Sequence, residues 1–367
     1  MLIYILALPV LIILSFKQKY KFSLPARFFL KNNKPFDKQG IWFHACSLGE
    51  VNSLKPVFKE LKNESLNLSV ITGTGYKSAK EINFLDVRFL PFEIFLPFWI
   101  KKQKTLVVTE AELWPLLFIV SKIKGIKTVL INARVSDNSY KSYKKFAWFY
   151  KWIFANIDEV FAQSKIDKKR LEELGAKSVV VNGNIKTFSK PIVTKKYKKL
   201  EKKVIVVASS HEGEEQIILD SLKLKKDEIL VVVPRHPERF ESVDRFLKEF
   251  CQKSKLSYSK IDDDLKTDIV LCDKMGELIN LYAISDVVIL CGSFKEGIGG
   301  HNPLEPAFFE TKIISGEFYF NQKPLFKLVE NIKICSINEL KDIDFEEIKS
   351  SKVLHVGDIN TLIEKIK

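Results

Sequence analysis

The chain has 367 residues, of which 46% are hydrophobic, so it is long enough for two domains with separate cores and too apolar to be disordered as a whole. The formal net charge of +14 indicates an anionic partner, and nucleic acid, an anionic membrane surface and a phosphorylated substrate all fit it. Five cysteines, an odd number with no CxxC pair, indicate a reduced, cytosolic environment.

The N-terminal run MLIYILALPVLIILSF carries no charged side chain, and Lys17, Lys19, Lys21 and Arg27 follow it closely. As a helix it would span about 24 Å, slightly less than the ~30 Å hydrocarbon core of a bilayer. The charges follow the run, unlike those of a secretory signal, and the positive-inside rule then keeps the remainder in the cytoplasm. We expect residues 1–16 to be a membrane anchor that spans the bilayer or lies in its interface, with a buried core helix as the alternative.

The first strand and helix are expected around HACSLGEVNSLKPVFKEL. Gly40–Phe43 predicts a short strand, and apolar residues then recur at helical spacing. Glu50 lies near the N-terminus of this helix, where the positive end of the helix dipole favours an ionised carboxylate. Such a carboxylate at the mouth of a loop can act as a general base. The alternative is a capping arrangement with Ser47.

The rest of the N-terminal half repeats the pattern of a buried strand followed by a polar turn. Because ligands bind at the carboxyl ends of strands in open parallel sheets, the polar residues that follow the strands are candidates for a site. These residues are Glu110 and Glu112 in TLVVTEAELWP, Asn132 and Arg134 in KTVLINAR, and Lys186 in GNIK. The Phe- and Trp-rich segment 87–102 predicts mostly core, with a surface for an amphiphilic lipid as the alternative.

A charge-dense run, TKKYKKLEKK, suggests a linker at residues 191–202 between domains at 17–190 and 203–367. The second half begins with four strand–loop–helix units, which predict a doubly wound parallel sheet. Their strands are expected at Lys203–Ala208, Ile229–Val233, Asp268–Cys272 and Asp286–Leu290.

The last of these units, Asp286–Pro306, carries the most informative loop. A buried strand is followed by four glycines, and His301-Asn302-Pro303 then leads into a helix. Glycines allow a close approach of the backbone to a ligand, and a helix N-terminus attracts anions such as phosphate. The alternative is a tight turn without a ligand.

Four of the five histidines, at positions 44, 211, 236 and 301, are expected in these loops. A four-histidine metal site is one interpretation, but the four come from separate units and lack HxxxH-type spacing. We therefore expect no metal. The run Asp262-Asp263-Asp264 is interpreted as a solvated connection rather than a metal-bound sugar-nucleotide site.

Taken together, the loops resemble those of the Kdo (3-deoxy-D-manno-octulosonic acid) transferases of Gram-negative bacteria. The matching motifs occur in the family's order between about Trp42 and Asn321, and the resemblance includes the expected N-terminal anchor. They are HACSLGE, EAELWP, NARVS, GNIK, SSHEGEE, PRHPER, MGEL and GGHNPLEP. Cys291, Asn138 and Glu93 depart from the family's usual Gly, basic residue and Asp, which bears on acceptor contacts rather than on the reaction.

The resemblance implies an α/β fold of the GT-B class, with two Rossmann-like doubly wound domains facing a cleft. It implies CMP-Kdo as donor, bound by the C-terminal half, and lipid IVA as acceptor, at the cytoplasmic face of the inner membrane. The reaction would be inverting and would need neither metal nor cofactor. The basic surface and apolar anchor suit this acceptor, because its phosphates are anionic and its acyl chains stay in the bilayer.

The resemblance also assigns roles to individual residues. Glu50 would be the base that takes the proton from the attacking hydroxyl, Lys186 would compensate developing charge, and Glu112 would support the arrangement. Negative charge that grows on the leaving phosphate would be stabilised by preorganised donors. The donor-binding residues would be Pro234, Arg235, Met275, Gly276, Glu277, Asn302, Pro303, Leu304 and Glu305.

Three other functions compete with this one. A different GT-B enzyme could use a UDP-sugar on a lipid or peptidoglycan precursor, and competition by CMP or UDP separates the two. A basic binding protein for nucleic acid or anionic membranes would bind in a salt-dependent way, but the sequence contains no recognised nucleic-acid module. A dinucleotide oxidoreductase is disfavoured because no GxGxxG follows the first strand of either half.

Overall fold

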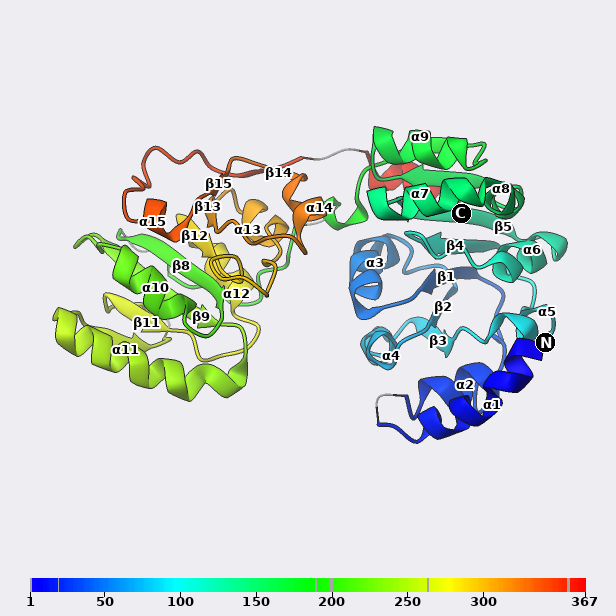
Figure 1. The fold of residues 1–367 in the computed structure, drawn as a ribbon, viewed down its shortest axis with the longest axis horizontal. Coiled ribbons are helices and arrows are strands. Elements are labelled where there is room, and N and C mark those ends of the chain that lie inside the picture. Colours follow the sequence, from blue (N-terminus) through cyan, green and yellow to red (C-terminus); the bar gives the residue numbers. More distant parts are fainter. Residues whose placement is uncertain (1, 19, 189, 199–200, 263, 355–356) are drawn as a thin grey trace. The chain divides into compact units, whose positions relative to one another are not determined.

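The computed structural model describes residues 2–18, 20–188, 190–198, 201–262, 264–354 and 357–367. The chain divides into two compact units (Figure 1). The N-terminal unit comprises residues 1–189 and 356–367, and the C-terminal unit comprises residues 190–355. This division differs from the expected domains at two places. The expected linker belongs to the C-terminal unit, and the last segment of the chain belongs to the N-terminal unit.

The N-terminal unit is built on a seven-stranded parallel sheet of order β3-β2-β1-β4-β5-β6-β7. Its strands are β1 (Ile41–Ala45), β2 (Leu66–Val70), β3 (Leu85–Phe89), β4 (Thr105–Thr109), β5 (Lys127–Ala133), β6 (Glu159–Ala162) and β7 (Val179–Val181). Its helices are α1 (Leu2–Ser15), α2 (Ser23–Phe28), α3 (Leu48–Glu60), α4 (Gly73–Lys80), α5 (Leu96–Trp99), α6 (Pro115–Ile123), α7 (Asp137–Lys145), α8 (Ala147–Phe154), α9 (Lys165–Glu173) and α16 (Ile359–Ile366), with 3₁₀ turns η1 (Glu93–Phe95) and η2 (Ile185–Thr187).

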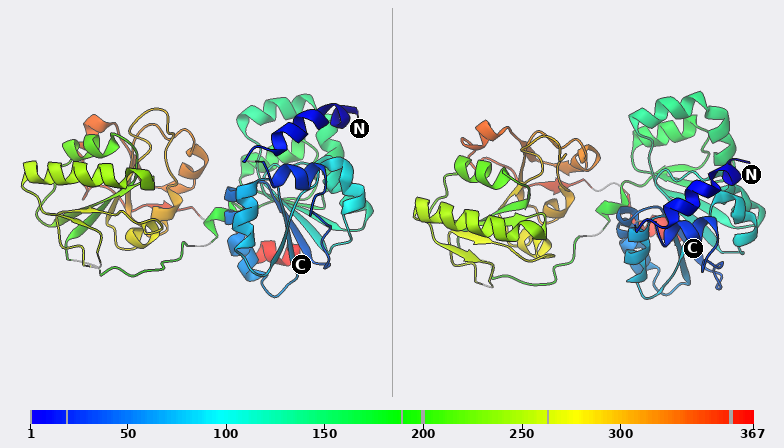
Figure 2. Two further views of the ribbon diagram at one scale, coloured as in Figure 1. Left: turned by 90° about the horizontal axis from the view of Figure 1, so that it is seen from below. Right: turned by 60° about the horizontal axis from the view of Figure 1, so that its bottom comes forward.

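The strands of this sheet are apolar on both faces, because helices cover both (Figure 2). Successive residues of a strand point to opposite faces, so Trp42 and Ile41 enter different cores. Apolar residues of α5, α6, α8 and α9 fill one core, and those of α3, α4 and α16 fill the other. Within the Phe- and Trp-rich segment, Phe89 and Trp99 are buried as expected, whereas Phe98 is 89% exposed.

Helix α16 packs on the N-terminal sheet although it follows the C-terminal unit in sequence. Leu362 and Ile366 are fully buried there with residues of α3 and the neighbouring strands. The hydroxyl of Thr105, the first residue of β4, donates a hydrogen bond to the carbonyl of Ile366 at 2.8 Å. The helix therefore completes one face of the N-terminal sheet.

The apolar N-terminal run forms helix α1, which lies beside α2 (Figures 1 and 2). Val10 and Ile13 are exposed, so the alternative of a buried core helix does not hold for this part of α1. Within the described ranges, no helix combines the length and hydropathy needed to cross a bilayer. The membrane anchor stays a prediction.

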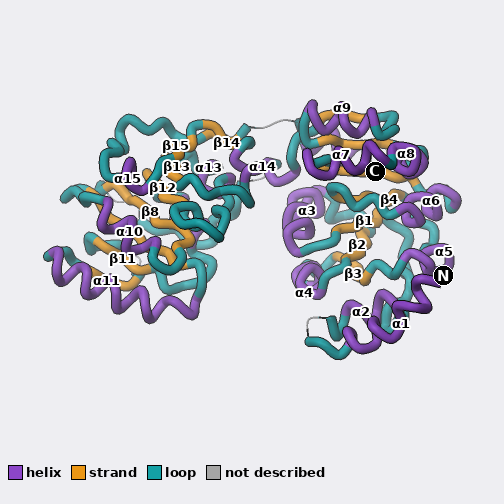
Figure 3. Tube along the Cα trace, in the orientation of Figure 1, coloured by secondary structure: helices purple, strands orange, loops and turns teal. Residues whose placement is uncertain are grey.

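The C-terminal unit is built on a second seven-stranded parallel sheet, of order β10-β11-β9-β8-β12-β13-β15. Figure 3 shows the strands of both units in orange and the helices in purple. Its strands are β8 (Lys203–Ser210), β9 (Glu228–Pro234), β10 (Tyr258–Lys260), β11 (Ile269–Leu271), β12 (Val287–Leu290), β13 (Lys312–Ser315) and β15 (Ile332–Ile334), and β14 (Val329–Glu330) pairs antiparallel with β16 (Lys352–Val353). Its helices are α10 (Glu214–Ser221), α11 (Phe240–Ser254), α12 (Leu278–Tyr282), α13 (Leu304–Ala307), α14 (Lys323–Phe326) and α15 (Ile337–Leu340), with the 3₁₀ turn η3 (Pro237–Arg239).

All four strand–loop–helix units expected at the start of the second half are confirmed, and so is the doubly wound parallel sheet. Residues of the expected linker pack against the C-terminal unit. Tyr197 is 5% exposed in the core of the C-terminal unit, and the backbone N–H groups of Thr194 and Lys195 donate to the side-chain oxygen of Asn280 at 2.9 and 3.1 Å.

Candidate active site

The strand order reverses direction between β1 and β4 in the N-terminal sheet and between β8 and β12 in the C-terminal sheet. Loops that leave the carboxyl ends of the two strands at such a switch point diverge and leave a crevice, which is where open α/β sheets bind ligands. The motif loops HACSLGE and EAELWP follow β1 and β4, and SSHEGEE and CGSFKEGIGGHNPLEP follow β8 and β12. Each unit thus carries its sequence motifs at its own switch point.

Glu50 lies in the first turn of α3, directly beyond β1. Ser47 caps this helix, its hydroxyl accepting from the Glu50 N–H and donating to Glu50 Oε1 at 2.9 Å. Glu50 Oε2 accepts from the Cys46 N–H at 2.9 Å and from the Thr109 hydroxyl at 2.7 Å. The expected capping arrangement is therefore present, and it holds a half-buried carboxylate between the ends of β1 and β4.

Glu112 follows β4 and faces the same region. Trp114 Nε1 donates to its carboxylate at 2.9 Å, and the Cys46 thiol donates to it as well. Burial raises the pKa of Glu112, and the neighbouring carboxylate of Glu50 raises it further, against the effect of these hydrogen bonds. Burial and the nearness of Glu112 in turn raise the pKa of the Cys46 thiol, so the thiol keeps its proton.

His44 was expected in a loop but lies within β1, which extends through Ala45. Its side chain is fully buried, and burial lowers its pKa to about 3, so the imidazole is neutral. Arg27 from α2 lies close to His44, Cys46 and Glu112 and donates through Nε to the Leu90 carbonyl at 3.0 Å. Sequence patterns did not single out this guanidinium, because it precedes the first expected strand.

Lys186 lies at the same edge of the N-terminal sheet as Asn132 and Arg134. Asn132 was expected after the strand but lies within β5, which extends through Ala133. Asn132 has a left-handed backbone, with φ of 53°, and its side-chain oxygen accepts from the N–H of Ile185 at 3.2 Å. This bond attaches the turn that carries the half-buried Lys186 to the end of β5. Glu110, whose φ is 55°, forms an ion pair with Arg134 at 3.1 Å. Non-glycine residues with positive φ cost free energy and cluster at functional sites.

In the C-terminal unit two histidines meet at the switch point. The Nε2 atoms of His211 and His301 lie 2.9 Å apart, so these two neutral rings share one hydrogen bond. Burial and, to a smaller extent, the nearby His211 and Arg235 lower the pKa of His301 to about 4. Gly292 permits this arrangement, because its φ is 72° and a Cβ there would lie 2.8 Å from His301 Cδ2.

The predicted donor-binding residues lie in three loops at this edge. Pro234 is the last residue of β9, and the exposed Arg235 follows it. Burial raises the pKa of the Glu305 carboxyl, and the nearby positive charge of Arg235 lowers it by a smaller amount. The side-chain NH₂ of Asn302 donates to the Glu305 carboxylate at 3.2 Å, and its side-chain oxygen accepts from the N–H of Leu304 at 3.0 Å. The short helix α13 begins at Leu304, directly after Asn302 and Pro303, as expected.

The third loop, MGEL, follows β11. Met275 is exposed, and Gly276 has a φ of 86°. The Glu277 carboxylate accepts from Tyr197 at 2.8 Å and from Asn280 at 3.0 Å. Burial acts to raise the pKa of Glu277, but these hydrogen bonds outweigh it and lower that pKa. Glu277 thus ties the segment before β8 to α12.

The chain is similar in sequence to a known family of enzymes. The family model described as 3-deoxy-D-manno-octulosonic-acid transferase (kdotransferase) matches residues 17–189. A 3-deoxy-D-manno-octulosonic acid transferase from Haemophilus influenzae is 32% identical over 352 residues, covering 88% of this chain and 82% of that protein. The chain belongs to the Kdo transferase family.

A second relative is a longer protein, only part of which is similar to this chain. A bifunctional glycosyltransferase/methyltransferase from Fusobacterium nucleatum is 36% identical over 326 residues, and the chain spans 81% of its own length and half of that relative's.

Two solved structures are similar to this Kdo transferase family member. UDP-GlcNAc 2-epimerase from Neisseria meningitidis covers 89% of this chain and 98% of its own at a TM-score of 0.53 and 12% identity, a likeness of fold alone. The C-terminal CMP-Kdo binding domain of WaaA from Acinetobacter baumannii is 29% identical over 45% of this chain and 88% of its own, with a TM-score of 0.35. The two parallel sheets agree with the GT-B class.

Two buried carboxylates near the histidine pair of this Kdo transferase family member were not predicted as site residues from the sequence. Glu214 is fully buried and accepts three backbone hydrogen bonds, from His211 at 3.0 Å, Gly292 at 2.9 Å and Phe294 at 3.1 Å. Glu215 forms a two-bond ion pair with Arg239 at 2.8 and 3.0 Å. In sequence, the two are indistinguishable from the acidic residues usual in a first helical turn.

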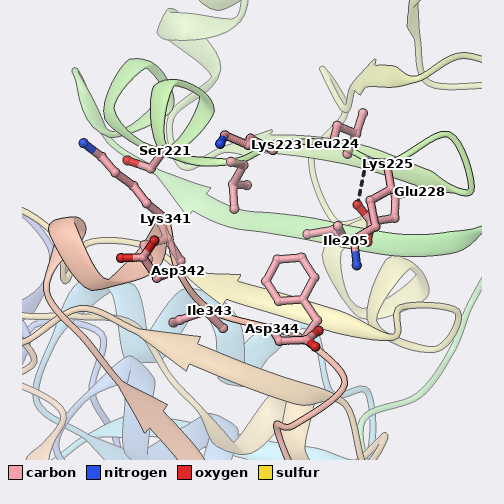
Figure 4. Close-up of a pocket in the computed structure, with 13 residues that line it drawn as sticks. Ile205, Ser221, Lys223, Leu224, Lys225, Glu228, Lys341, Asp342, Ile343 and Asp344 are labelled. Atoms are coloured by element: carbon pink, nitrogen blue, oxygen red, sulfur yellow. Dashed lines mark hydrogen bonds between the residues drawn. The ribbon is translucent and has the colours of Figure 1, made fainter.

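A pocket of about 250 Å³ in the C-terminal unit lies away from the motif loops of the Kdo transferase (Figure 4). It is lined by the end of α10, the start of β9 and the segment after α15, with Lys223, Lys341 and Phe345 among its residues. The pocket lies at the edge of the sheet where β9 begins, whereas the motif loops lie at the opposite edge, where the strands end. None of the predicted site residues lines this pocket.

Proposed function

We propose that the chain transfers Kdo from CMP-Kdo to the lipid A precursor lipid IVA, in an inverting reaction that uses no metal. The observation that carries this proposal is membership of the Kdo transferase family over 88% of the chain, with the family's motif residues at the switch points of both sheets. The donor and the acceptor are those that the family resemblance implies.

In this reaction Glu50 acts as general base. A carboxylate offers about four lone-pair sites, and three of those of Glu50 are engaged by Ser47, Cys46 and Thr109. Oε1 carries only one of these bonds, so it is the atom left to accept a proton from the acceptor hydroxyl. The fixed carboxylate needs no reorientation before proton transfer, which favours its role as a base.

The deprotonated hydroxyl oxygen attacks the anomeric carbon of Kdo, and the bond from that carbon to the CMP phosphate oxygen breaks. Attack from the side opposite the leaving group inverts the configuration. CMP leaves with the bonding electrons, and negative charge grows on its phosphate. Arg235 and the N–H groups at Asn302–Glu305 stabilise this charge, and Lys186 compensates it. Glu112 supports the position of the base through Cys46.

We also propose that the chain works at the cytoplasmic face of the inner membrane. Helix α1 would anchor it as a single span or as an interfacial helix, and α8 offers a second contact. Phe146, Trp148 and Trp152 are exposed there beside Lys145 and Lys151. Aromatic rings and lysines together suit the headgroup region of an anionic bilayer. Sedimentation with anionic and neutral vesicles tests this, and equal binding to both would contradict it.

Incubation of the purified chain with lipid IVA and freshly generated CMP-Kdo tests the reaction. A mass increase of the lipid by one or more Kdo units, with matching release of CMP, is the expected result. Glu50→Gln should abolish transfer and keep CMP binding, whereas the exposed Glu60→Gln on the same helix serves as the matched control. Transfer from UDP-sugars instead of CMP-Kdo would refute the donor, and wild-type transfer by Glu50→Gln would refute the base.

A further inference from the structure

Three side chains at the switch point of the N-terminal sheet bring together a nitrogen, a sulfur and an oxygen ligand. One ring nitrogen of His44, Sγ of Cys46 and a carboxylate oxygen of Glu112 all lie within 4.8 Å of one another. His44 and Cys46 come from β1 and the residue after it, and Glu112 comes from the loop after the adjacent β4. In the part of the chain that is described, no other group of three such side chains meets this condition.

The hydrogen bonds of His44 determine its tautomer. Nδ1 lies 3.1 Å from the carbonyl oxygen of Ser69 and 2.9 Å from its hydroxyl. A carbonyl oxygen only accepts, so Nδ1 carries the proton and Nε2 carries a lone pair. That Nε2 is buried and has no hydrogen-bond partner among the described residues. A buried nitrogen without a partner is costly. Histidines that bind metals commonly donate their other N–H to a backbone carbonyl, as His44 does.

The hydrogen bond from the Cys46 thiol to Glu112 gives two of the three side chains a polar partner even when no ion is bound. It provides no partner for the buried Nε2 of His44. A cation bound to all three would use the Nε2 lone pair, replace the thiol proton and neutralise charge on Glu112. Because Cys46 and Glu112 are only half-buried, an ion can reach the cluster from solvent.

The ligand types select the kind of ion. Imidazole, thiolate and carboxylate together suit Zn²⁺ and similar thiophilic ions, and they do not suit Mg²⁺ or Ca²⁺, which prefer oxygen. Tetrahedral zinc holds its ligand atoms about 3.3–3.6 Å apart, so the ligand atoms must approach one another by up to about 1.5 Å from their 4.8 Å limit. Rotation of the half-buried Glu112 side chain can supply this movement. The positive charge of Arg27 nearby opposes binding and limits affinity.

We propose that His44, Cys46 and Glu112 form a site for a thiophilic divalent cation, and that its occupation inhibits the enzyme. Binding forms one bond each to Nε2, Sγ and a carboxylate oxygen, and the Sγ proton leaves to solvent. The inhibitory part rests on the proposed function of Glu50. The Cys46 N–H donates to Glu50 at 2.9 Å, so a dication at Cys46 lies beside the base, attracts its electrons and reduces its ability to take a proton.

Cobalt binding to the full chain tests the site without any substrate. Co²⁺ coordinated by a thiolate absorbs in the near ultraviolet, and we expect this band to saturate at one Co²⁺ per chain and to disappear on addition of Zn²⁺. Cys46→Ala and Cys46→Ser should remove the band. Cys251→Ala, which removes a buried free thiol in the C-terminal unit, should keep it. Absence of the band in the wild type, or its persistence in Cys46→Ala, would overturn the site.

Release of CMP in buffered Zn²⁺ tests the inhibition. Wild-type transfer should fall as the site fills and recover when the metal is chelated. Cys46→Ala, measured relative to its own metal-free rate, should need at least tenfold more free Zn²⁺. Wild-type transfer that is unchanged when cobalt competition shows the site to be full would overturn the inhibitory role. A chain that transfers no Kdo at all refutes the proposed function and its inhibition, whereas the cobalt band still decides the site.

Discussion

The buried carboxylate of Glu214 holds together the two loops that carry His211 and His301. Its Oε2 accepts from the N–H groups of His211 and Gly292, and its Oε1 accepts from that of Phe294. These loops leave β8 and β12, the strands on either side of the switch point. Replacing Glu214 by Gln keeps the size of the side chain and exchanges one oxygen for an NH₂ group.

The cost of Glu214→Gln follows from the number of donors. The amide oxygen can still accept from two N–H groups, but the NH₂ group cannot accept from the third. A hydrogen bond to a charged group contributes about 1.5–3 kcal/mol, and at full burial no water can replace the lost acceptor. We therefore expect the free energy that protects the Gly292 and Phe294 amides to fall by about that amount, which corresponds to roughly 10- to 150-fold faster exchange.

Native-state hydrogen exchange is the appropriate assay, because two units make a single two-state transition a poor description of unfolding. The amides of Gly292 and Phe294 report the loop itself, and amides of β4 in the N-terminal unit serve as an internal reference. Glu212→Gln, an exposed neighbour, is the matched control and should change protection by less than about 0.5 kcal/mol. Equal protection of both amides in Glu214→Gln and wild type would refute this account of the loops.

Three further predictions concern stability. Gly292→Ala should destabilise the C-terminal unit by at least about 1 kcal/mol in urea unfolding, because a Cβ would lie 2.8 Å from His301, and by more than Gly297→Ala, which also has positive φ but no atom within 4 Å. Burial lowers the pKa of His301 from its ordinary value of about 6.5 to about 4, so the stability of the C-terminal unit should be full above pH 6.5 and fall by at most about 1.4 kcal/mol per pH unit toward pH 4; a slope in His301→Gln as steep as in wild type would contradict this. Leu362→Ala should lower the stability of the N-terminal unit by about 2–5 kcal/mol, whereas exposed Glu364→Ala should leave its thermal transition unchanged within error.

The architecture of both sheets was predictable because it depends on local patterns. Apolar runs such as Val287–Leu290 indicate strands buried on both faces, and the polar residues after them necessarily share one edge of a parallel sheet. Placement of Glu50 and of Asn302 before α13 followed from helix-capping patterns in the same way.

Other features depend on contacts between distant segments, which local patterns do not encode. His44 looks like a loop residue next to Cys46, and only the pairing of β1 through Ala45 with β2 buries it. Glu214 resembles any acidic residue of a first helical turn until the loop after β12 folds over it. Helix α16 has a clear apolar face at Leu362 and Ile366, but periodicity cannot say which of two sheets has an uncovered surface for it.

The return of α16 to the first sheet has a consequence for how the protein is made. During synthesis the N-terminal unit emerges from the ribosome first and would ordinarily fold first. Here one face of its sheet stays incomplete, because the surface that receives Leu362 and Ile366 is uncovered until residues 357–367 have been translated, after the whole C-terminal unit. Nascent or prematurely terminated chains therefore present this apolar surface to chaperones and proteases. An N-terminal unit expressed alone should be made with residues 357–367 joined to it.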